Sequence, residues 1–239
     1  MVVKKRKQGR ICASELMRRL ERDPKHLERE RQRKDKEARI REAVEREMHP
    51  VLEDLAHIGI DVGSREELLA SHSPLQPEVV DILLRRLPEI EDERAKEMLV
   101  RALGAAAEPF DGTCLIDLFE KDRTENLRWV IANTMALALP HGVTNWLVGA
   151  VEQRKYGTSR QMLILALARL GDREVTLPVL RRVFDAYPGH VAMALGEIGR
   201  EAEAGFLESR TDGLTGWEGK EAVKAIDKIR RRVARRSGR

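Results

Sequence analysis

The feature that most constrains the fold of this 239-residue chain is the spacing of its apolar residues after Pro77, at three- and four-residue intervals. Leu127, Val130, Ile131 and Thr134 illustrate the pattern. In an α-helix this spacing places the side chains along one stripe, which faces a core. No stretch shows the sustained period-two alternation that is typical of a half-buried strand. The sequence therefore predicts an all-α fold without a sheet.

The apolar stripes come in pairs that repeat along the chain. The second stripes of successive pairs end near Leu103, Leu139, Leu170, Ile198 and Ile229, at intervals of 28–36 residues. This interval is the length of one helix pair, and a single pair cannot bury its own stripes, so neighbouring pairs must stack. The predicted pairs are residues 79–87 with 95–103, 115–119 with 127–137, 146–151 with 163–170, 177–184 with 191–198, and 204–207 with 217–236.

A glycine follows the second stripe in three of these pairs, at Gly104, Gly171 and Gly199, and Pro140 takes that place in another. Glycine adopts the left-handed backbone conformation without steric cost, and helices often end on such a residue. The sequence therefore predicts left-handed helix caps at the three glycines.

Two of these junctions resemble the HEAT repeat, in the short bacterial form shared with the phycobilin-lyase-type repeats. That pattern runs Ala-Leu-Gly-x-x-Gly-Asp-x-x-Ala and then Leu-Pro-x-Leu. Ala166–Leu180 and Met193–Ala202 match it, and Arg101–Ala107 is a weaker match. The likeness covers about residues 77–236, and the whole layout is similar to that of uncharacterised bacterial HEAT-like proteins. It implies a right-handed α-solenoid of about five HEAT-like helix pairs, whose second helices line the inner, concave surface.

Three segments of different character make up the chain. We expect residues 1–48 to form a charged helical arm and residues 49–76 to form short helices and a linker. Residues 77–239 are expected to form the HEAT-like α-solenoid, which ends in a basic C-terminal cap helix. Within the first two segments we predict one helix from Pro24 to Glu47 and a separate one from His49, which stops at Gly59.

The predicted arm helix has few apolar positions and many opposite charges at helical spacing. Such pairs stabilise a helix by only a few tenths of a kcal/mol each, and little apolar surface is left to bury. We expect an exposed arm, either simply solvated or used to bind a partner or another copy of the chain.

The net charge of +4 hides a segregation along the chain. Residues 1–50 carry 17 basic and 10 acidic side chains, residues 51–219 carry 18 and 28, and residues 220–239 carry 9 and 2. A basic patch suits phosphate backbones, acidic protein faces or anionic surfaces. Nucleic acid is therefore a possible partner through the basic termini only, and the acidic middle favours a protein partner.

Several classes of protein are excluded or disfavoured. No run of about 18 apolar residues exists, so no transmembrane segment is expected. The basic N-terminus is not followed by the long apolar stretch of a signal peptide. Cys12 and Cys114 are too few for a disulfide framework. We expect a cytoplasmic protein.

Motifs of catalysis are missing from the sequence. It contains no phosphate-binding glycine loop, no nucleophile elbow and no pair of histidines or cysteines at metal-ligand spacing. The glycine-rich stretch Gly213–Gly219 lies between predicted helices and is read as a flexible loop. We expect a non-catalytic protein with no cofactor and no metal.

Candidate partner-binding residues are those on the second helices that lie off the apolar stripe. Trp129 is the most informative, because an exposed tryptophan often anchors an interface, although packing against the next repeat is the alternative. The candidates are Arg128, Trp129, Asn133, Arg160, Gln161, Arg169, His190 and Met193, and the C-terminal basic patch comprises Lys224, Lys228, Arg231, Arg232, Arg235 and Arg236.

The favoured function is a protein–protein interaction scaffold that uses the concave surface. The alternative is a HEAT-like nucleic-acid-binding protein, or an enzyme similar to the alkylpurine DNA glycosylases, which would use Trp129 with Arg128 or Arg160. A third hypothesis, phycobilin-lyase-like chromophore chemistry, rests on the repeat resemblance alone. The sequence leaves the partner's identity and the oligomeric state open.

Overall fold

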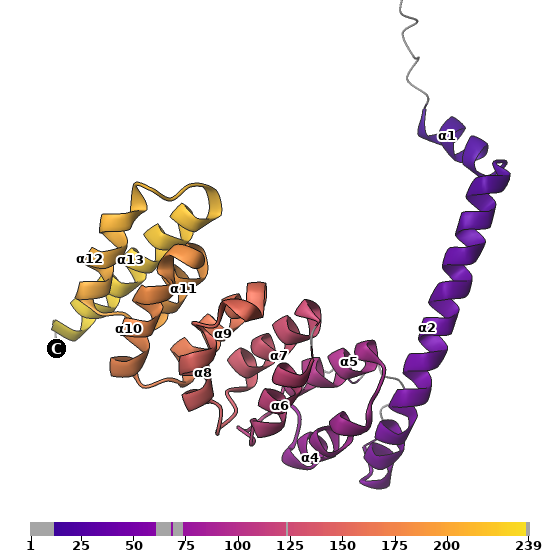
Figure 1. Cartoon of the computed structure of the whole chain (residues 1–239), viewed down its shortest axis with the longest axis horizontal. Helices are drawn as coiled ribbons and strands as arrows, with labels where there is room; N and C mark the ends of the chain where they lie inside the picture. Colours follow the sequence, from indigo (N-terminus) through magenta and orange to yellow (C-terminus); the bar gives the residue numbers. More distant parts are fainter. Residues whose placement is uncertain (1–11, 61–67, 69–73, 123, 238–239) are drawn as a thin grey trace, which may run out of the picture. The chain divides into compact units, whose positions relative to one another are not determined.

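The computed structural model describes residues 12–60, 68, 74–122 and 124–237, and its described residues form helices and no strand, as predicted (Figure 1). Two isolated bridges, Leu75 with Ala106 and Asp111 with His141, join neighbouring loops. The chain divides into two compact units, Met1–Arg46 and Glu47–Arg239. No helix in the described part is long and apolar enough to span a bilayer.

The first unit holds α1 (Ala13–Leu20) and the beginning of α2 (Pro24–His57). Pro24 occupies the first turn of α2, as predicted, where its missing N–H costs nothing. The Asp23 carboxylate accepts a hydrogen bond from the Lys25 backbone N–H at 3.0 Å and so satisfies one free donor of that turn.

The prediction of a helix break between Glu47 and His49 is wrong, because α2 continues through Pro50 to His57. Proline removes one backbone hydrogen bond and disfavours the helix. Met48, Val51 and Leu55 offset this cost, since they share one side of α2 and are at most 1 % exposed. Gly59, with φ of +78°, then ends the segment as predicted.

The C-terminal end of α2, which belongs to the second unit, is also held by an ion pair within that unit, between Asp54 and Arg86. The Asp54 carboxylate accepts hydrogen bonds from Arg86 Nε at 2.8 Å and Arg86 Nη2 at 3.0 Å. Arg86 and Arg85 together lower the pKa of Asp54. Much of the remaining linker predicted within 49–76 lies outside the described residues.

The rest of the second unit consists of alternating helices that match the predicted segments. The first helices are α4 (Pro77–Arg86), α6 (Thr113–Lys121), α8 (Thr144–Ala150), α10 (Arg173–Val183) and α12 (Glu201–Thr211). The second helices are α5 (Glu93–Leu103), α7 (Glu125–Ala138), α9 (Arg160–Leu170), α11 (Pro188–Ile198) and α13 (Gly216–Ser237). Short 3-10 turns are η1 (Leu87–Glu89), η2 (Arg154–Ser159) and η3 (Phe184–Ala186).

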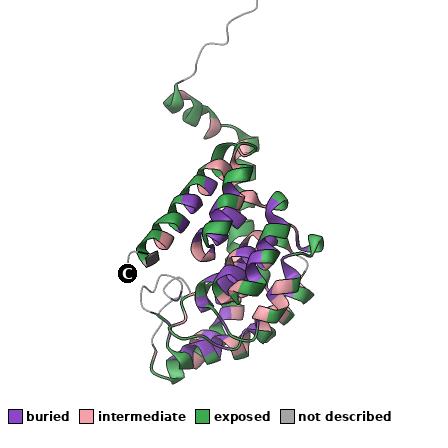
Figure 2. Ribbon diagram, turned by 90° about the vertical axis from the view of Figure 1, so that its left-hand side faces the viewer, coloured by how far each residue is buried: buried purple, intermediate pink, exposed green. Residues whose placement is uncertain are grey.

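Each second helix packs on the second helix before it, from α5 through α7, α9 and α11 to α13, and also on the first helix of its own pair. Figure 1 shows α4, α6, α8 and α10 along one side of this unit and α5, α7, α9 and α11 along the other. Buried residues lie on the sides of the helices that face one another, and exposed residues lie on the outer sides (Figure 2). Among the described residues, each second helix therefore has one side whose residues are mostly half-buried or exposed.

The junction glycines do not adopt the predicted left-handed conformation. Gly104, Gly171 and Gly199 have φ of −64°, −81° and −63°, and Leu139 is the described non-glycine residue with positive φ, at 52°. These glycines are needed for close packing instead. A Cβ on Gly171 would lie 2.2 Å from Thr176 Oγ1, and one on Gly199 would lie 2.5 Å from the Leu195 carbonyl.

Candidate functional site

The uncovered side of the second helices carries side chains in matching register. Met98, Asn133, Leu165 and Met193 each lie five residues before the last residue of their helix, and all four are half-buried. The positions one helical turn earlier, nine residues before the end of each helix, are Arg94, Trp129, Gln161 and Gly189. Because consecutive second helices pack side by side, we infer that equal positions lie in rows across them. We call the two rows the second-helix face: Arg94, Met98, Trp129, Asn133, Gln161, Leu165, Gly189 and Met193.

Trp129 and Gln161, both half-buried, occupy the earlier row on α7 and α9. Gly189 takes this position on α11, and Trp217 of α13 covers it. A Cβ on Gly189 would lie 2.1 Å from Trp217 Cζ3, so only glycine leaves room for the indole. The Trp217 ring also lies 5.1 Å from that of His190, and partial burial lowers the pKa of His190. Trp217 is still 47 % exposed, so the face offers a second accessible indole.

The face continues onto α13 as a basic stripe. Lys224, Lys228, Arg231 and Arg235 follow one another at four-, three- and four-residue intervals, which places them on one side of the helix, and all are exposed. This side borders α11, because a Cβ on Gly196 would lie 3.9 Å from Lys228 Cδ. We call these four residues the basic stripe.

Two of the predicted arginines face inward instead. Arg128 Nε donates to the Phe119 carbonyl at 2.9 Å, and Arg160 Nε donates to the Val151 carbonyl at 2.7 Å. Each arginine thus reaches back nine residues, to the C-terminal end of the first helix of its own pair. Each guanidinium also lies against the tyrosine of the next unit, 5.4 Å from the Tyr156 ring centre for Arg128 and 5.0 Å from the Tyr187 ring centre for Arg160.

These contacts correct the expectation that Arg160 is an exposed binding residue, because it is only 7 % exposed. Apolar periodicity places a residue off the main stripe but does not say which neighbour it meets. A buried arginine is tolerated where its N–H groups find acceptors, and the unpaired carbonyls at a helix C-terminus supply them.

Two further predicted residues join one second helix to another. Arg169 Nη1 donates to the Ala136 carbonyl of α7 at 2.8 Å, and its Nε and Nη2 each lie 3.2 Å from the Glu197 carboxylate of α11. Arg232 donates to the α11 carbonyls of Gly196 at 3.0 Å and Glu197 at 2.7 Å, and also to that of Gly199. A cation at the negative end of a helix is favourable, so both arginines stabilise the stacking.

Lys224 and Arg236 of the predicted basic patch are not described in contacts that join two helices. Lys224 pairs with Glu221 at 2.7 Å on the surface, and the side chain of Arg236 lies outside the described residues. An exposed pair such as Lys224–Glu221 contributes little stability, so Lys224 stays available to a partner.

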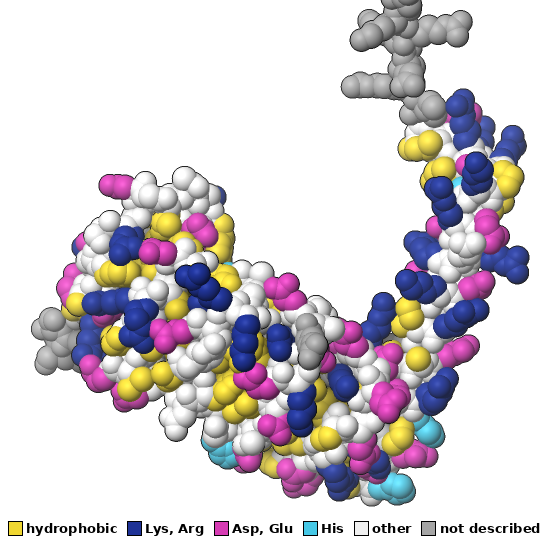
Figure 3. Space-filling view, viewed as in Figure 1, with side chains coloured by type: hydrophobic (Ala, Val, Ile, Leu, Met, Phe, Trp, Pro, Cys, Tyr) yellow, Lys and Arg dark blue, Asp and Glu magenta, His cyan; other side chains and the backbone are white. Residues whose placement is uncertain are grey.

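Carboxylates beside the face are neutralised within the chain. Glu97 accepts from Arg101 at 2.7 Å and from Asn126 at 2.8 Å, and Glu197 is paired with Arg169. In Figure 3, basic and acidic side chains are interspersed, without a continuous acidic surface. The net negative charge of the middle of the sequence therefore does not gather into one acidic patch on the side that Figure 3 shows.

Sequence reasoning missed Met98 and Leu165. Met98 lies within the predicted apolar segment 95–103, and Leu165 lies among the apolar residues of α9, so composition gave no reason to select either. Both residues lie five positions before the last apolar residue of their helix, Leu103 or Leu170, and this spacing can be read from the sequence. Trp146 is half-buried and donates its indole N–H to Glu120 at 3.0 Å.

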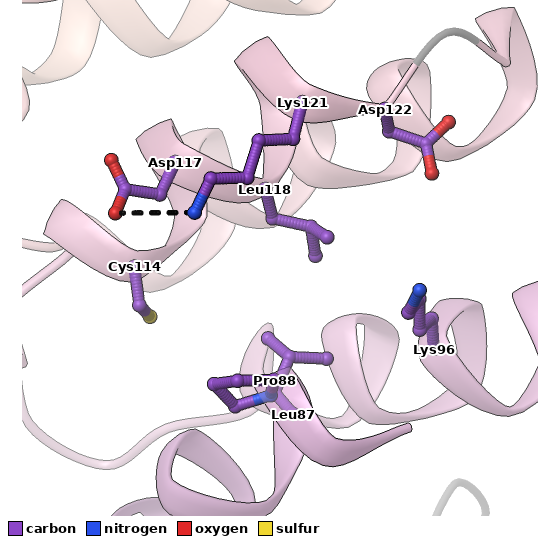
Figure 4. Close-up of a pocket in the computed structure, with 8 residues that line it drawn as sticks. All are labelled: Leu87, Pro88, Lys96, Cys114, Asp117, Leu118, Lys121 and Asp122. Carbon is purple, nitrogen blue, oxygen red and sulfur yellow. Dashed lines mark ion pairs between the residues drawn. The ribbon is translucent and has the colours of Figure 1, made fainter. Parts of the chain in front are cut away.

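A separate cavity of about 320 Å³ lies between η1, α5 and α6. Figure 4 shows Leu118 facing Pro88 and Leu87 across it, with Cys114 at one end and Lys121 turned back toward Asp117, 4.0 Å away. Burial, together with the charges of Asp111 and Asp117, raises the pKa of Cys114 to about 11. A thiol with so high a pKa is almost wholly protonated at neutral pH and is a poor nucleophile.

The two cysteines should therefore differ in reactivity. Cys12 is exposed, and its hydrogen bond with Ser14 lowers its pKa. At pH 8 we expect Cys114 to react with a disulfide reagent about a hundredfold more slowly than Cys12, because the thiolate is the reactive species. Stopped-flow labelling of C12S and C114S variants measures each rate separately, and equal rates would contradict the assignment.

Comparison of the chain with protein-family models, curated proteins and solved structures finds no match.

Proposed function

We propose that this chain is a non-catalytic, cytoplasmic HEAT-like α-solenoid of five helix pairs, and that it binds a segment of another protein on the second-helix face. The observation that carries the proposal is that half-buried Met98, Asn133, Leu165 and Met193 each lie five residues before the end of the second helix in four consecutive pairs. The HEAT-like junctions of the sequence support the architecture.

The composition of the face supports a protein partner. Thioethers, a leucine, amides and the indoles of Trp129 and Trp217 combine apolar contact area with groups that form hydrogen bonds. Interfaces are enriched in tryptophan and methionine and depleted of charge at their centre, and these side chains give the face that character. Trp129 is the expected anchor, because a few aromatic residues usually carry most of the binding energy.

The glycosylase-like alternative finds less support. It relied on Arg128 or Arg160 next to Trp129, and both guanidinium groups donate to backbone carbonyls and lie against tyrosine rings. A group held in this way would have to break its existing hydrogen bond to reach a substrate.

Site-specific photo-crosslinking in cells of the native host tests the proposal. A photoreactive phenylalanine at Asn133 or at Gln161 should give the same discrete adduct, because both positions lie on the face. The matched control is Val175, which is 50 % exposed but lies on α10. A W129A substitution in the Asn133-labelled protein should reduce the adduct at least about tenfold.

Equal adducts from Asn133 and Val175, or none from either face position, would contradict the proposal. Circular dichroism of each labelled protein shows whether the helices are intact.

A further inference from the structure

The second-helix face changes in chemistry along the direction in which the helices stack. From α7 to α11 it presents Trp129, Asn133, Leu165 and Met193, all half-buried. At α13 it presents the indole of Trp217 and then the basic stripe. A partner that crosses the helices thus meets an apolar and amide surface first and a positively charged surface at one end.

Among the described residues positive charge predominates at that end, where Asp227 is the exposed carboxylate within the stripe. Lys228, Arg231 and Arg235 are exposed, whereas Glu221 is paired with Lys224, and Glu197 with Arg169. Positive charge on a face attracts complementary negative charge and suppresses partners of like charge.

The remainder of the face disfavours nucleic acid. A phosphate backbone carries charge along its whole length and is bound by basic groups spaced along its path. Between α7 and α11, Arg169 is tied to Ala136 and Glu197, and Arg160 is buried. The uncharged side chains of this part form no ion pair with a phosphate, but they can pack against the apolar side of a peptide.

The spacing of packed helices limits the length of the partner segment. Neighbouring helix axes lie about 8–10 Å apart, so a bound α-helix advances about six residues, and an extended chain about three, from one second helix to the next. Contact from α7 to α13 therefore takes about 20 residues of helix or about 10 residues of extended chain.

We propose that the partner of the second-helix face is an amphipathic segment of another protein that places apolar side chains on α7, α9 and α11 and an acidic end on the basic stripe of α13. This inference rests on the proposed function, because it names the chemistry of the segment bound at the same face.

Selection from a displayed library of random 20-residue peptides tests this inference with the full chain. Peptides retained by the unaltered protein should combine apolar residues with a cluster of Asp and Glu toward one end. Their affinity should fall at least about tenfold in K228E/R235E and in W129A, and should weaken with added salt. The matched control K121E/R154E changes the net charge equally at exposed residues outside the face and should bind like the unaltered protein.

The outcomes distinguish a failure of this inference from a failure of the proposed function. Peptides that need Trp129 but show no acidic preference, or bind K228E/R235E unchanged, overturn the inference and leave the proposed function standing. Peptides insensitive to W129A, or no retained peptides, contradict both. Single-stranded oligonucleotides that bind through the basic stripe, without selected acidic peptides, overturn the inference in favour of nucleic acid.

Discussion

Replacing Phe119 by alanine is expected to lower the free energy of unfolding of the Glu47–Arg239 unit by about 4 kcal/mol. Phe119 is fully buried, and its ring packs edge-on against Trp146 at 5.1 Å and Tyr156 at 5.0 Å. The guanidinium of Arg128 lies 5.5 Å from the same ring centre. Truncation would leave a cavity where two helix pairs meet, and the surrounding rings cannot collapse into it without leaving their own partners.

Urea unfolding of the full chain, followed by circular dichroism, measures this loss. The matched control is Val175→Ala, because Val175 is half-exposed, and its truncation should change stability by less than about 0.5 kcal/mol. A loss below about 1 kcal/mol for F119A would mean that the ring cluster does not hold these helix pairs together.

The second large effect is expected at Arg160. Substitution by methionine keeps an apolar stem of similar length but removes the donor to the Val151 carbonyl and the contact with the Tyr187 ring. Val151 is fully buried, so its carbonyl would lose a hydrogen bond that water does not readily replace. We expect a loss of about 2 kcal/mol in the free energy of unfolding.

Arg154→Met is the matched control for R160M, since Arg154 is exposed in the neighbouring turn η2 and should tolerate the change. The two interpretations of Arg160 predict opposite results. As a residue of the interior, R160M lowers stability. As the partner-binding residue predicted from sequence, R160M would leave urea unfolding unchanged and reduce the crosslinked adduct.

The candidate site was only partly accessible to sequence reasoning. Trp129, Asn133, Gln161 and Met193 were selected because they lie off the apolar stripes, and all four are half-buried in the structure. Arg160 met the same criterion but is buried. A helical period gives the direction of a side chain relative to its own helix, and an arginine is long enough to reach a carbonyl on a neighbouring one.

The glycines and Pro50 also show that the type of a residue does not by itself determine its backbone conformation. Gly171 and Gly199 were predicted from a local rule about helix ends, whereas the structure requires them because a Cβ would collide with adjacent atoms. Separate helices were predicted to end at Glu47 and to begin at His49, but burial of Met48 and Val51 keeps one helix continuous through Pro50. In each case the packing of neighbouring atoms outweighed the preference of the residue type.

An all-helical fold and the positions of most helices follow from the apolar period and the turn residues, because these act within a few residues of one another. Which off-stripe residues are exposed and which arginines join helices became clear only from the tertiary structure. Those properties depend on the register between helices about 30 residues apart in the sequence, which is set by side-chain packing across their interfaces.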